Sequence, residues 1–454
     1  MSARLGRLIG RMVDVRAGEG AALAWSGAYH FFILTAYYIL RPIRDEMGVL
    51  GGVENLAWLF TGTLAGMTLL HPFYSALVAR LPRRRFIPWV NRFFLLNLVV
   101  FYLVLRATSG AASVWVGRVF FIWVSVFNLF VVSVFWSFMA DLYRPTQSRR
   151  LFGIVAVGGT LGAVLGSSLT SALVGPLGPV TLLLVSALFL ELASQAARRL
   201  DRQEEHLRRA AEGLPEVERE ERSAEPEPEI IGGGVLEGIG HVLRSPYLLG
   251  IAALMLFFTI SSTFLYFQQA AITREVFGDD SAARTRLFAN MDLAVNVLTL
   301  LTQLFVTGRI LRWLGVGVSL AFLPVLSTIG FAILGVAPGL GALVVLQVLR
   351  RAGNFAIQRP AREVLYTVLP RTDKYKAKNF NDTFVYRVGD QIGGWSYTLI
   401  AWLGLGISGL SFIMVPFCAL WVALAVWLGR KYRALQGARA QAAVGIGEVG
   451  LSRA

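Results

Sequence analysis

Long apolar runs separated by short polar loops limit what this chain can fold into. The sequence of 454 residues is 55% hydrophobic. It contains many separate runs of about 20 apolar residues, the length of helix that crosses a hydrocarbon layer of about 30 Å. Its mean hydropathy is +0.60. We therefore predict an all-α integral membrane protein that crosses the lipid bilayer many times.

The apolar runs fall into two sets of six predicted membrane spans. The first set lies at about 22–41, 56–79, 86–105, 114–140, 151–174 and 179–196. The second set lies at about 247–268, 287–307, 316–337, 340–360, 384–403 and 407–429. Between them, a charged stretch containing AEPEPE and GGG is typical of a soluble linker. The predicted parts are a segment 1–20, a six-helix bundle 21–196, a linker 197–243, a second bundle 244–432 and a tail 433–454.

The distribution of Lys and Arg predicts the orientation of the spans. The N-terminal segment, the linker, the tail and the loops after spans 2, 4, 8 and 10 hold most of these residues. The loops on the other side hold six: Arg41, Arg44, Arg106, Arg274, Arg284 and Arg286. Because basic loops stay in the cytoplasm, both termini and the linker are expected to be cytoplasmic. We expect a monomer in a bacterial inner membrane.

The two sets of spans also resemble each other in sequence. Arg44-Asp45 with Gly48 is echoed by Arg274-Glu275 with Gly278, at an offset of 230. Basic turns follow the second span of each set, VARLPRRRF at 78–86 and TGRILRWLG at 307–315. Two similar six-helix halves joined by a cytoplasmic linker make up the major facilitator architecture, in which solute binds between the halves. The sequence therefore predicts twelve transmembrane helices in two six-helix pseudo-repeats.

Ionisable residues inside predicted spans are the main candidates for function, because a charge in lipid is costly unless it is paired or lines a polar cavity. The clearest stretch is EVLYTVLPRTDKYKAKNFNDTFVYRVGDQIGG at 363–394. It places Asp382, Arg387 and Asp390 near an apolar run, and Arg387 and Asp390 are spaced to pair on one helix face. We predict that these three residues hold or gate the bundle.

The end of the first span and the eighth span add further charged candidates. Arg41, Arg44 and Asp45 lie in YYILRPIRDEMG at 37–48, and Asp292 lies deep in the eighth span. Asp45 and Asp292 are predicted to form ion pairs or to gate, whereas Arg41 and Arg44 are predicted to bind solute.

Positive charge also lies deep in the tenth span. Arg350 and Arg351 are adjacent there, with no acidic residue within several positions. Planar guanidinium groups suit phosphate or carboxylate, so an anion site is one interpretation. Pairing with Asp292 or Asp390 across the bundle, or reaching toward a membrane interface, is equally compatible with the sequence.

Several other functions are disfavoured. The formal charge of +15 is scattered between apolar runs, so we expect no nucleic-acid partner. The single cysteine, Cys418, excludes an internal disulfide and a cysteine-based metal site. The four histidines lack metal-site spacing, and neither a phosphate-binding loop nor a nucleophile elbow is present. We therefore expect no enzyme activity, no catalytic residues, no metal and no cofactor.

Three segments resemble the ATP/ADP translocase family of nucleotide transporters. They are YYILRPIRDEMGV at 37–49, QSRRLFGIVAVGG at 147–159, and EVLYTVLP with KYKAKNFNDTFVYRVGDQIGG at 363–394. The resemblance aligns Arg44 and Asp45 with the family's Lys-Asp pair. It also aligns Lys376, Lys378, Asp382, Arg387 and Gly389 with the family's last motif. It implies an exchanger of anions or nucleotides in which Lys376 and Lys378 contact solute. Pro42 and Asp390 depart from the family pattern.

Three functional hypotheses follow from the sequence. The first is a secondary transporter that moves an anionic, nucleotide-like or phosphorylated solute by alternating access and counter-exchange. The second is a proton-coupled facilitator for another organic solute; it is disfavoured because few carboxylates lie deep in the spans. The third is a membrane protein that does not transport, such as a scaffold or a partner subunit.

Overall fold

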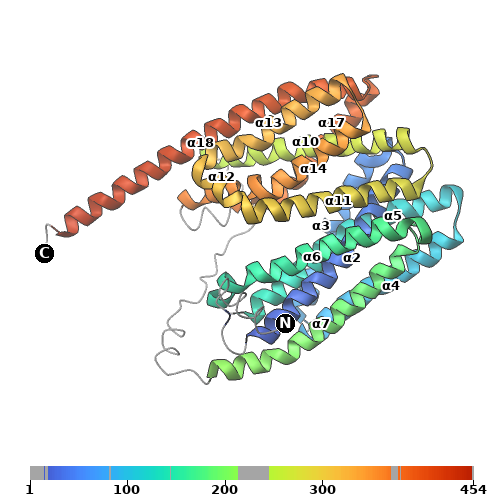
Figure 1. The fold of residues 1–454 in the computed structure, drawn as a ribbon, viewed down its shortest axis with the longest axis horizontal. Helices are drawn as coiled ribbons and strands as arrows, with labels where there is room; N and C mark the ends of the chain where they lie inside the picture. Colours follow the sequence, from blue (N-terminus) through green and yellow to red (C-terminus); the bar gives the residue numbers. More distant parts are fainter. Residues whose placement is uncertain are drawn as a thin grey trace. The chain divides into compact units, whose positions relative to one another are not determined.

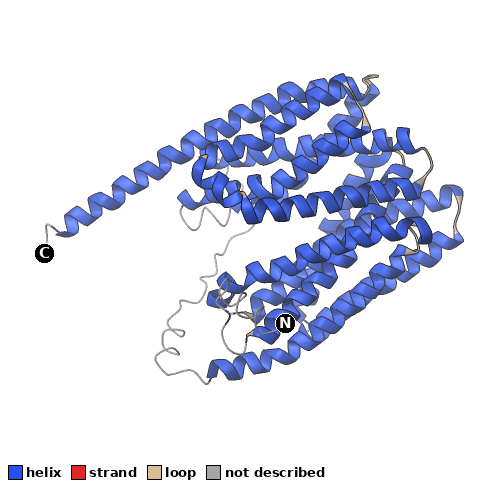
Figure 2. Cartoon of the chain, viewed as in Figure 1, coloured by secondary structure: helices blue, strands red, loops and turns tan. Residues whose placement is uncertain are grey.

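The described part of the chain is almost entirely helical. The computed structural model describes residues 15, 19–80, 83–143, 145–212, 245–369, 377–378 and 380–451, and these contain helices and turns but no strand (Figure 2). Every predicted span is represented by a long helical segment in this part, which confirms the predicted fold class.

The helices of the first half correspond to the six predicted spans. They are α2 (Gly20–Leu50), α3 (Leu56–Arg80), α4 (Arg83–Ala107), α5 (Gly110–Leu142), α6 (Pro145–Leu177) and α7 (Leu182–Glu212), with a short 3-10 turn η1 (Val53–Asn55) before α3. Helix α2 continues nine residues past its predicted end at 41, because the charged residues at its end are paired with other side chains. Helix α7 continues into the predicted linker, and residues 213–244 lie outside the described residues.

The second half contains shorter and interrupted helices. They are α10 (Pro246–Phe277), α11 (Ser281–Phe305), α12 (Thr307–Trp313), α13 (Gly315–Val336), α14 (Leu340–Gly353), the π-helical turn η2 (Asn354–Gln358), α15 (Arg359–Leu365), the 3-10 turn η3 (Tyr366–Val368), the π-helical turn η4 (Asn381–Val385), α17 (Tyr386–Trp402) and α18 (Ile407–Leu451). The tenth span is thus one helical path, 340–365, with a π-helical turn inside it. Such turns are frequent at functional sites.

The chain divides into two compact units that differ from the sequence halves in two segments. Unit 1 consists of Met1–Gly52, Thr61–Glu229 and Phe277–Asn296, and unit 2 consists of Val53–Phe60, Ile230–Val276 and Val297–Ala454. Each half therefore contributes the start of its second helix to the other unit. The predicted boundaries, 21–196 and 244–432, do not include this exchange and remain a prediction.

Unit 1 is built around α2. Helices α6 and α7 pack closely along it, and α5 packs on it as well (Figure 1). The contact with α6 depends on glycines at small-xxx-small spacing. A Cβ atom on Gly158 would lie 2.5 Å from the carbonyl oxygen of Gly27, and one on Gly162 would collide with the carbonyl oxygen of Phe31. The two helix backbones are therefore in direct contact.

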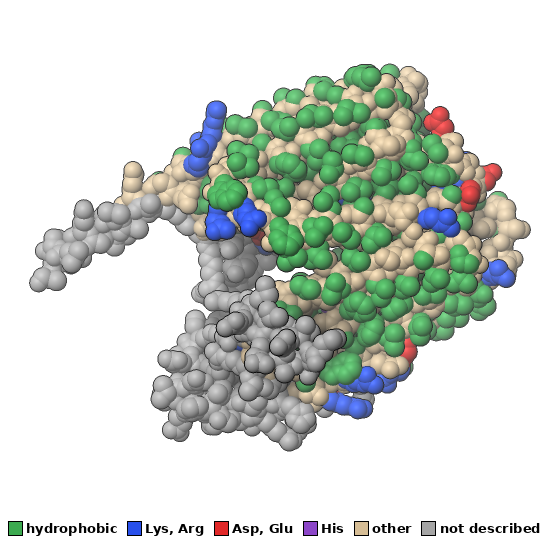
Figure 3. Space-filling model, in the orientation of Figure 1, with side chains coloured by type: hydrophobic (Ala, Val, Ile, Leu, Met, Phe, Trp, Pro, Cys, Tyr) green, Lys and Arg blue, Asp and Glu red, His purple; other side chains and the backbone are tan. Residues whose placement is uncertain are grey.

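Both units expose many large hydrophobic side chains. Figure 3 shows a face largely covered by hydrophobic side chains, with few charged side chains. Exposed Trp89 (74%), Trp313 (77%) and Trp402 (71%) are of the kind that gathers at membrane interfaces. Eight of the described helices are long and apolar enough to cross a membrane by length and composition. These features are those of a multi-pass membrane protein.

The α2–α6 contact generates a stability prediction. Gly162→Ala should lower the free energy of unfolding by about 1–3 kcal/mol, because the new methyl group forces the two helices apart. Gly153→Ala is the matched control on the same helix, since nothing lies within 4 Å of its would-be Cβ. That change should be neutral, or stabilising by up to about 1 kcal/mol. Thermal unfolding in detergent measures both variants, and equal shifts would contradict this account of α2–α6 packing.

Candidate functional site

The end of α2 brings four charged residues into unit 1 within two helical turns. The segment RPIRDE at 41–46 stays helical, and Asp45 and Glu46 are buried. Charges at such positions need partners, because burial of an unpaired ion costs several kcal/mol. The start of α11 and the neighbouring α5 supply polar side chains to this segment.

The best-formed pair joins Glu46 of α2 to Arg284 of α11. Arg284 Nε donates to Glu46 Oε2 at 2.6 Å, and Arg284 Nη2 donates to Glu46 Oε1 at 2.7 Å. The side chains of Glu46 and Arg284 are 0% and 2% exposed, respectively. A further donor of Arg284, Nη1, bonds the carbonyl oxygen of Gly278. This bidentate pair attaches the start of α11 to unit 1.

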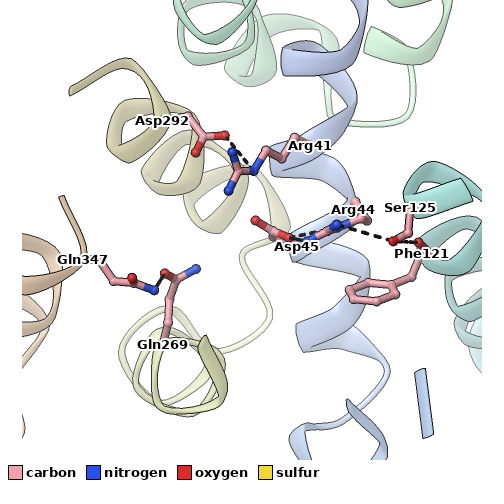
Figure 4. A network of polar contacts seen from close by, with 8 residues as sticks. All are labelled: Arg41, Arg44, Asp45, Phe121, Ser125, Gln269, Asp292 and Gln347. Carbon is pink, nitrogen blue, oxygen red and sulfur yellow. Dashed lines mark hydrogen bonds and ion pairs between the residues drawn. The ribbon is translucent and has the colours of Figure 1, made fainter. Parts of the chain in front are cut away.

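Arg44, two residues before Glu46, pairs with Asp45. Its Nε and Nη2 donate to Asp45 Oδ1 at 3.1 and 2.7 Å, and its Nη1 donates to Ser125 Oγ at 3.4 Å. The guanidinium lies over the ring of Phe121 at 4.8 Å (Figure 4). The carboxylate and hydroxyl thus take up donors on all three guanidinium nitrogens of Arg44.

Arg41 has a much looser environment. Its Nε lies 3.6 Å from Asp292 Oδ2, which is longer than a hydrogen bond, and its guanidinium is 5.8 Å from the ring centre of Tyr38 (Figure 4). The Arg41 side chain is 20% exposed and that of Asp292 is 2% exposed. In the part of the chain that the structure describes, no hydrogen bond from Arg41 is found. This guanidinium therefore keeps its N–H donors available.

Arg350 on α14 is the most buried of the predicted arginines in unit 2. It is 2% exposed and donates to Ser327 Oγ at 2.8 Å, Ser261 Oγ at 2.5 Å and Ser262 Oγ at 3.2 Å. It also donates to the carbonyl oxygens of Ser261 at 3.2 Å and Phe258 at 3.3 Å. All its hydrogen-bond partners among the described residues are neutral oxygens, and its guanidinium also lies 5.8 Å from the ring centre of Phe258. The predicted pairing of Arg350 with Asp390 is therefore wrong within the described part of unit 2, whereas its predicted pairing with Asp292, a residue of unit 1, stays a prediction.

Two glutamines of unit 2 face each other near Arg350. Gln347 on α14 donates from Nε2 to Oε1 of Gln269 on α10 at 2.7 Å (Figure 4). The two residues are 6% and 5% exposed. Neighbouring Gln268 points elsewhere and donates to Ser411 Oγ at 2.9 Å. Sequence reasoning did not detect this pair.

The remaining predicted site residues lie mostly in ion pairs of unit 2. Arg387 Nη1 lies 3.5 Å from Asp390 Oδ2, so these two residues form the pair that their spacing predicted. Arg362 Nη2 lies 3.3 Å from Asp382 Oδ1. Lys378 Nζ lies 2.6 Å from Glu363 Oε2. Arg351 lies beside Arg350 on α14 with a partly exposed side chain, and Lys376 lies outside the described residues.

Sequence reasoning missed the partners of these residues. Arg284, Arg362 and Glu363 were not predicted to be partners, although each pairs with a charge from a separate helical segment. Local spacing can reveal only pairs within one helix, such as Arg387 with Asp390. The only available signal was the presence of unmatched opposite charges in different spans.

A family model described as Major Facilitator Superfamily matches residues 22–370. This chain belongs to that superfamily. The match covers most of the sequence and includes both units. Major facilitator proteins are membrane transporters, so the chain is a secondary transporter that moves small solutes across a lipid bilayer. No curated protein matches the sequence.

Solved structures of several transporters resemble this one. A bacterial homolog of the human lysosomal transporter Spinster, inward-facing and unoccupied, matches with a TM-score of 0.56 and 13% identity, covering 93% of this chain and 99% of that one. The POT family transporter PepTSo matches with a TM-score of 0.59 and 13% identity, covering 91% of this chain and 98% of that one. A mutant of the nucleoside transporter NupG matches with a TM-score of 0.54 and 11% identity, over the same shares of the two chains. At these identities the likeness establishes the fold alone.

The Glu46–Arg284 pair generates a second stability prediction. Arg284→Gln should lower the free energy of unfolding by about 3–5 kcal/mol, because it leaves Glu46 ionised and buried without its guanidinium. Replacing both residues by Met should recover most of this loss, since no charge is then stranded.

The matched control for this prediction is Arg92→Gln. Arg92 pairs with Glu191 at 3.1 Å, but the two side chains are 50% and 29% exposed. Removing so exposed a pair should cost about 0–1 kcal/mol. Thermal unfolding of the purified protein measures all three variants. A double Met variant no more stable than Arg284→Gln would show that the pair does not act as described.

Proposed function

We propose that this transporter moves a small anionic solute, nucleotide-like or phosphorylated, by alternating access with counter-exchange. The observation that supports the proposal is Arg41, a partly buried guanidinium whose N–H donors are not taken by hydrogen bonds in the described part of the chain. Its counterparts Arg44, Arg284 and Arg350 each donate several hydrogen bonds. A cation left open in this way is suited to an arriving anion.

The physical argument rests on the geometry of the guanidinium. Arginine presents five N–H donors in a rigid fork that matches a carboxylate or a phosphate. The nearest approach of Arg41 to Asp292 is from Nε to Oδ2, at 3.6 Å, so in this proposal an anion approaches the guanidinium while the ion pair persists. Charge-assisted hydrogen bonds of this kind are roughly twice as strong as neutral ones.

The positive charge of Arg350 adds to the preference for an anion. Hydroxyl and carbonyl oxygens solvate this guanidinium but do not cancel its charge. Because electrostatic interactions are stronger in a medium of low dielectric constant than in water, a net charge here favours solutes of opposite sign. In this proposal Arg350 acts as a fixed charge, because its side chain is held by three serines.

The other predicted residues take secondary roles in the proposal. Arg44 and Lys378 already have carboxylate partners, so they contact solute only if those partners release them. Asp45, Asp382, Arg387 and Asp390 hold or gate the helices through ion pairs. Arg351 and Lys376 complete the predicted set of solute-binding cations. In this proposal the transporter works as a monomer in a bacterial inner membrane, with both termini on the cytoplasmic side.

Proton-coupled transport is the second candidate, favoured by Asp292. This carboxylate is 1% exposed, and its Oδ2 lies 3.6 Å from Nε of Arg41. A buried carboxylate near a solute-binding arginine can exchange protons during transport. The resemblance to the ATP/ADP translocase family favours the first candidate. The nucleoside transporter NupG, at 11% identity, is too distant in sequence to decide the solute.

Flux measurements in proteoliposomes separate the two candidates. Vesicles are loaded with ATP, ADP or inorganic phosphate, and uptake of labelled ATP, ADP or phosphate is followed. Uptake that needs an internal anion supports exchange, whereas uptake driven by an imposed pH gradient supports proton coupling. Lack of flux for all three solutes under both conditions would contradict the proposed solute class.

Substitution of Arg41 gives the residue-level prediction. Arg41→Gln should reduce uptake of the transported anion by at least about tenfold, because one lost charged hydrogen bond costs about 1.5–3 kcal/mol. Arg41→Lys keeps the charge but loses the fork, so its uptake should be intermediate. Arg198→Gln, at an exposed pair with Glu191, is the control and should keep wild-type uptake. Wild-type uptake by Arg41→Gln would reject Arg41 as the anion site.

A further inference from the structure

Gln269 and Gln347 form a hydrogen-bonded pair of carboxamides between α10 and α14, which we call the amide clamp. We propose that the amide clamp binds a flat group of the solute that presents a hydrogen-bond acceptor beside a donor. A carboxamide and the edge of a nucleobase both have this chemistry. The inference rests on the proposed function only in taking this group to be part of the transported solute.

The hydrogen bond within the clamp engages one of its two NH2 groups and one of its two carbonyl oxygens. A primary amide offers two N–H donors and two acceptor lone pairs. Gln347 Nε2 donates to Gln269 Oε1 at 2.7 Å, which leaves the NH2 group of Gln269 and the carbonyl oxygen of Gln347 without a hydrogen-bond partner in the described ranges. Figure 4 shows the Gln269 amide nitrogen on the side of this amide away from Gln347. The pair therefore presents one unpaired donor group, the NH2 of Gln269, and one unpaired acceptor, the carbonyl oxygen of Gln347.

These two groups lie well inside the protein, because the residues are 94–95% buried (6% and 5% exposed). Buried polar groups in proteins are normally hydrogen-bonded, and leaving one unsatisfied costs about 1–3 kcal/mol. A pair that keeps an unpaired donor group and an unpaired acceptor group at such low exposure is suited to a ligand whose complementary edge would satisfy both.

The residues around the clamp further restrict the chemical class of the ligand. Gln347 and Arg350 are three residues apart on α14, so they lie on one face of the helix. Arg350 provides a full positive charge with neutral partners in the described chain, which favours a flat group attached to an anionic solute. Glutamine amides pair with adenine through one donor and one acceptor. A site of this kind rejects analogues that lack the matching groups, because its own polar atoms would then be left unpaired.

A matched set of ligands and variants tests the clamp in the full-length protein. Dissociation constants are measured in detergent for AMP, adenosine and ribose 5-phosphate, and for N-acetylglutamine and N-acetylglutamate. The main variant replaces both glutamines, Gln269→Met with Gln347→Met, because exchanging both partners of a hydrogen bond for apolar groups of similar size is nearly neutral for folding. Gln268→Met is the control, since Gln268 donates to Ser411 instead.

We expect the wild type to bind AMP at least about tenfold more tightly than ribose 5-phosphate, which has the same phosphate but no base. The double variant should lose most of this preference and keep its affinity for ribose 5-phosphate, whereas Gln268→Met should keep the preference. A preference for N-acetylglutamine over N-acetylglutamate that the double variant abolishes would identify the flat group as a carboxamide instead.

The proposal is overturned if the wild type binds AMP no more tightly than ribose 5-phosphate and N-acetylglutamine no more tightly than N-acetylglutamate. It is also overturned if the double variant keeps the wild-type preference. This failure is distinct from failure of the anion proposal. Binding of ribose 5-phosphate that Arg41→Gln abolishes, without a preference for the base, rejects the clamp alone. Equal binding of adenosine and AMP, with the base preference lost in the double variant, supports the clamp and rejects the anion.

Discussion

Pairing of buried charge is the constraint on which the rest of this structure depends. Six ionisable groups gather where the end of α2 meets the start of α11, and they form the pairs Glu46–Arg284, Arg44–Asp45 and Arg41–Asp292. An ion removed from water without such a partner would cost several kcal/mol. The pairs explain why α2 continues as a helix through 41–46 and why residues 277–296 belong to unit 1.

The three pairs differ in contact distance and in burial, and these differences indicate different roles. Glu46–Arg284 is bidentate and sealed, so it holds two helices together. Arg44 is held by Asp45, Ser125 and the ring of Phe121. Arg41 alone keeps its donors open beside a carboxylate at 3.6 Å. In unit 2, Arg350 is fixed by serines and the amide clamp keeps a donor and an acceptor available. The fixed groups build the transporter, and the open groups are suited to the solute.

The sequence predicted the helices far better than the partners of the charged residues. Apolar runs of about 20 residues locate spans because lipid selects for length and hydropathy, and each predicted span has its helix. The Arg387–Asp390 pair was also predictable, since it lies within one helix. Arg284 and Arg362 could not be assigned, because their partners come from helical segments brought together only by the tertiary fold. The sequence also contained no sign that residues 53–60 belong to unit 2 and residues 277–296 to unit 1, because hydrophobic periodicity does not report which helices pack together.

Chemical modification of arginine tests the central claim most directly, because dicarbonyl reagents such as phenylglyoxal need a free and reachable guanidinium. The full-length protein is treated with the reagent, with and without the transported anion, and the modified residues are located by mass spectrometry. The account predicts that Arg41 reacts before Arg284 and Arg350 and that the anion protects it. Arg41 that reacts no faster than Arg284 or Arg350, or that no tested anion protects, would contradict it.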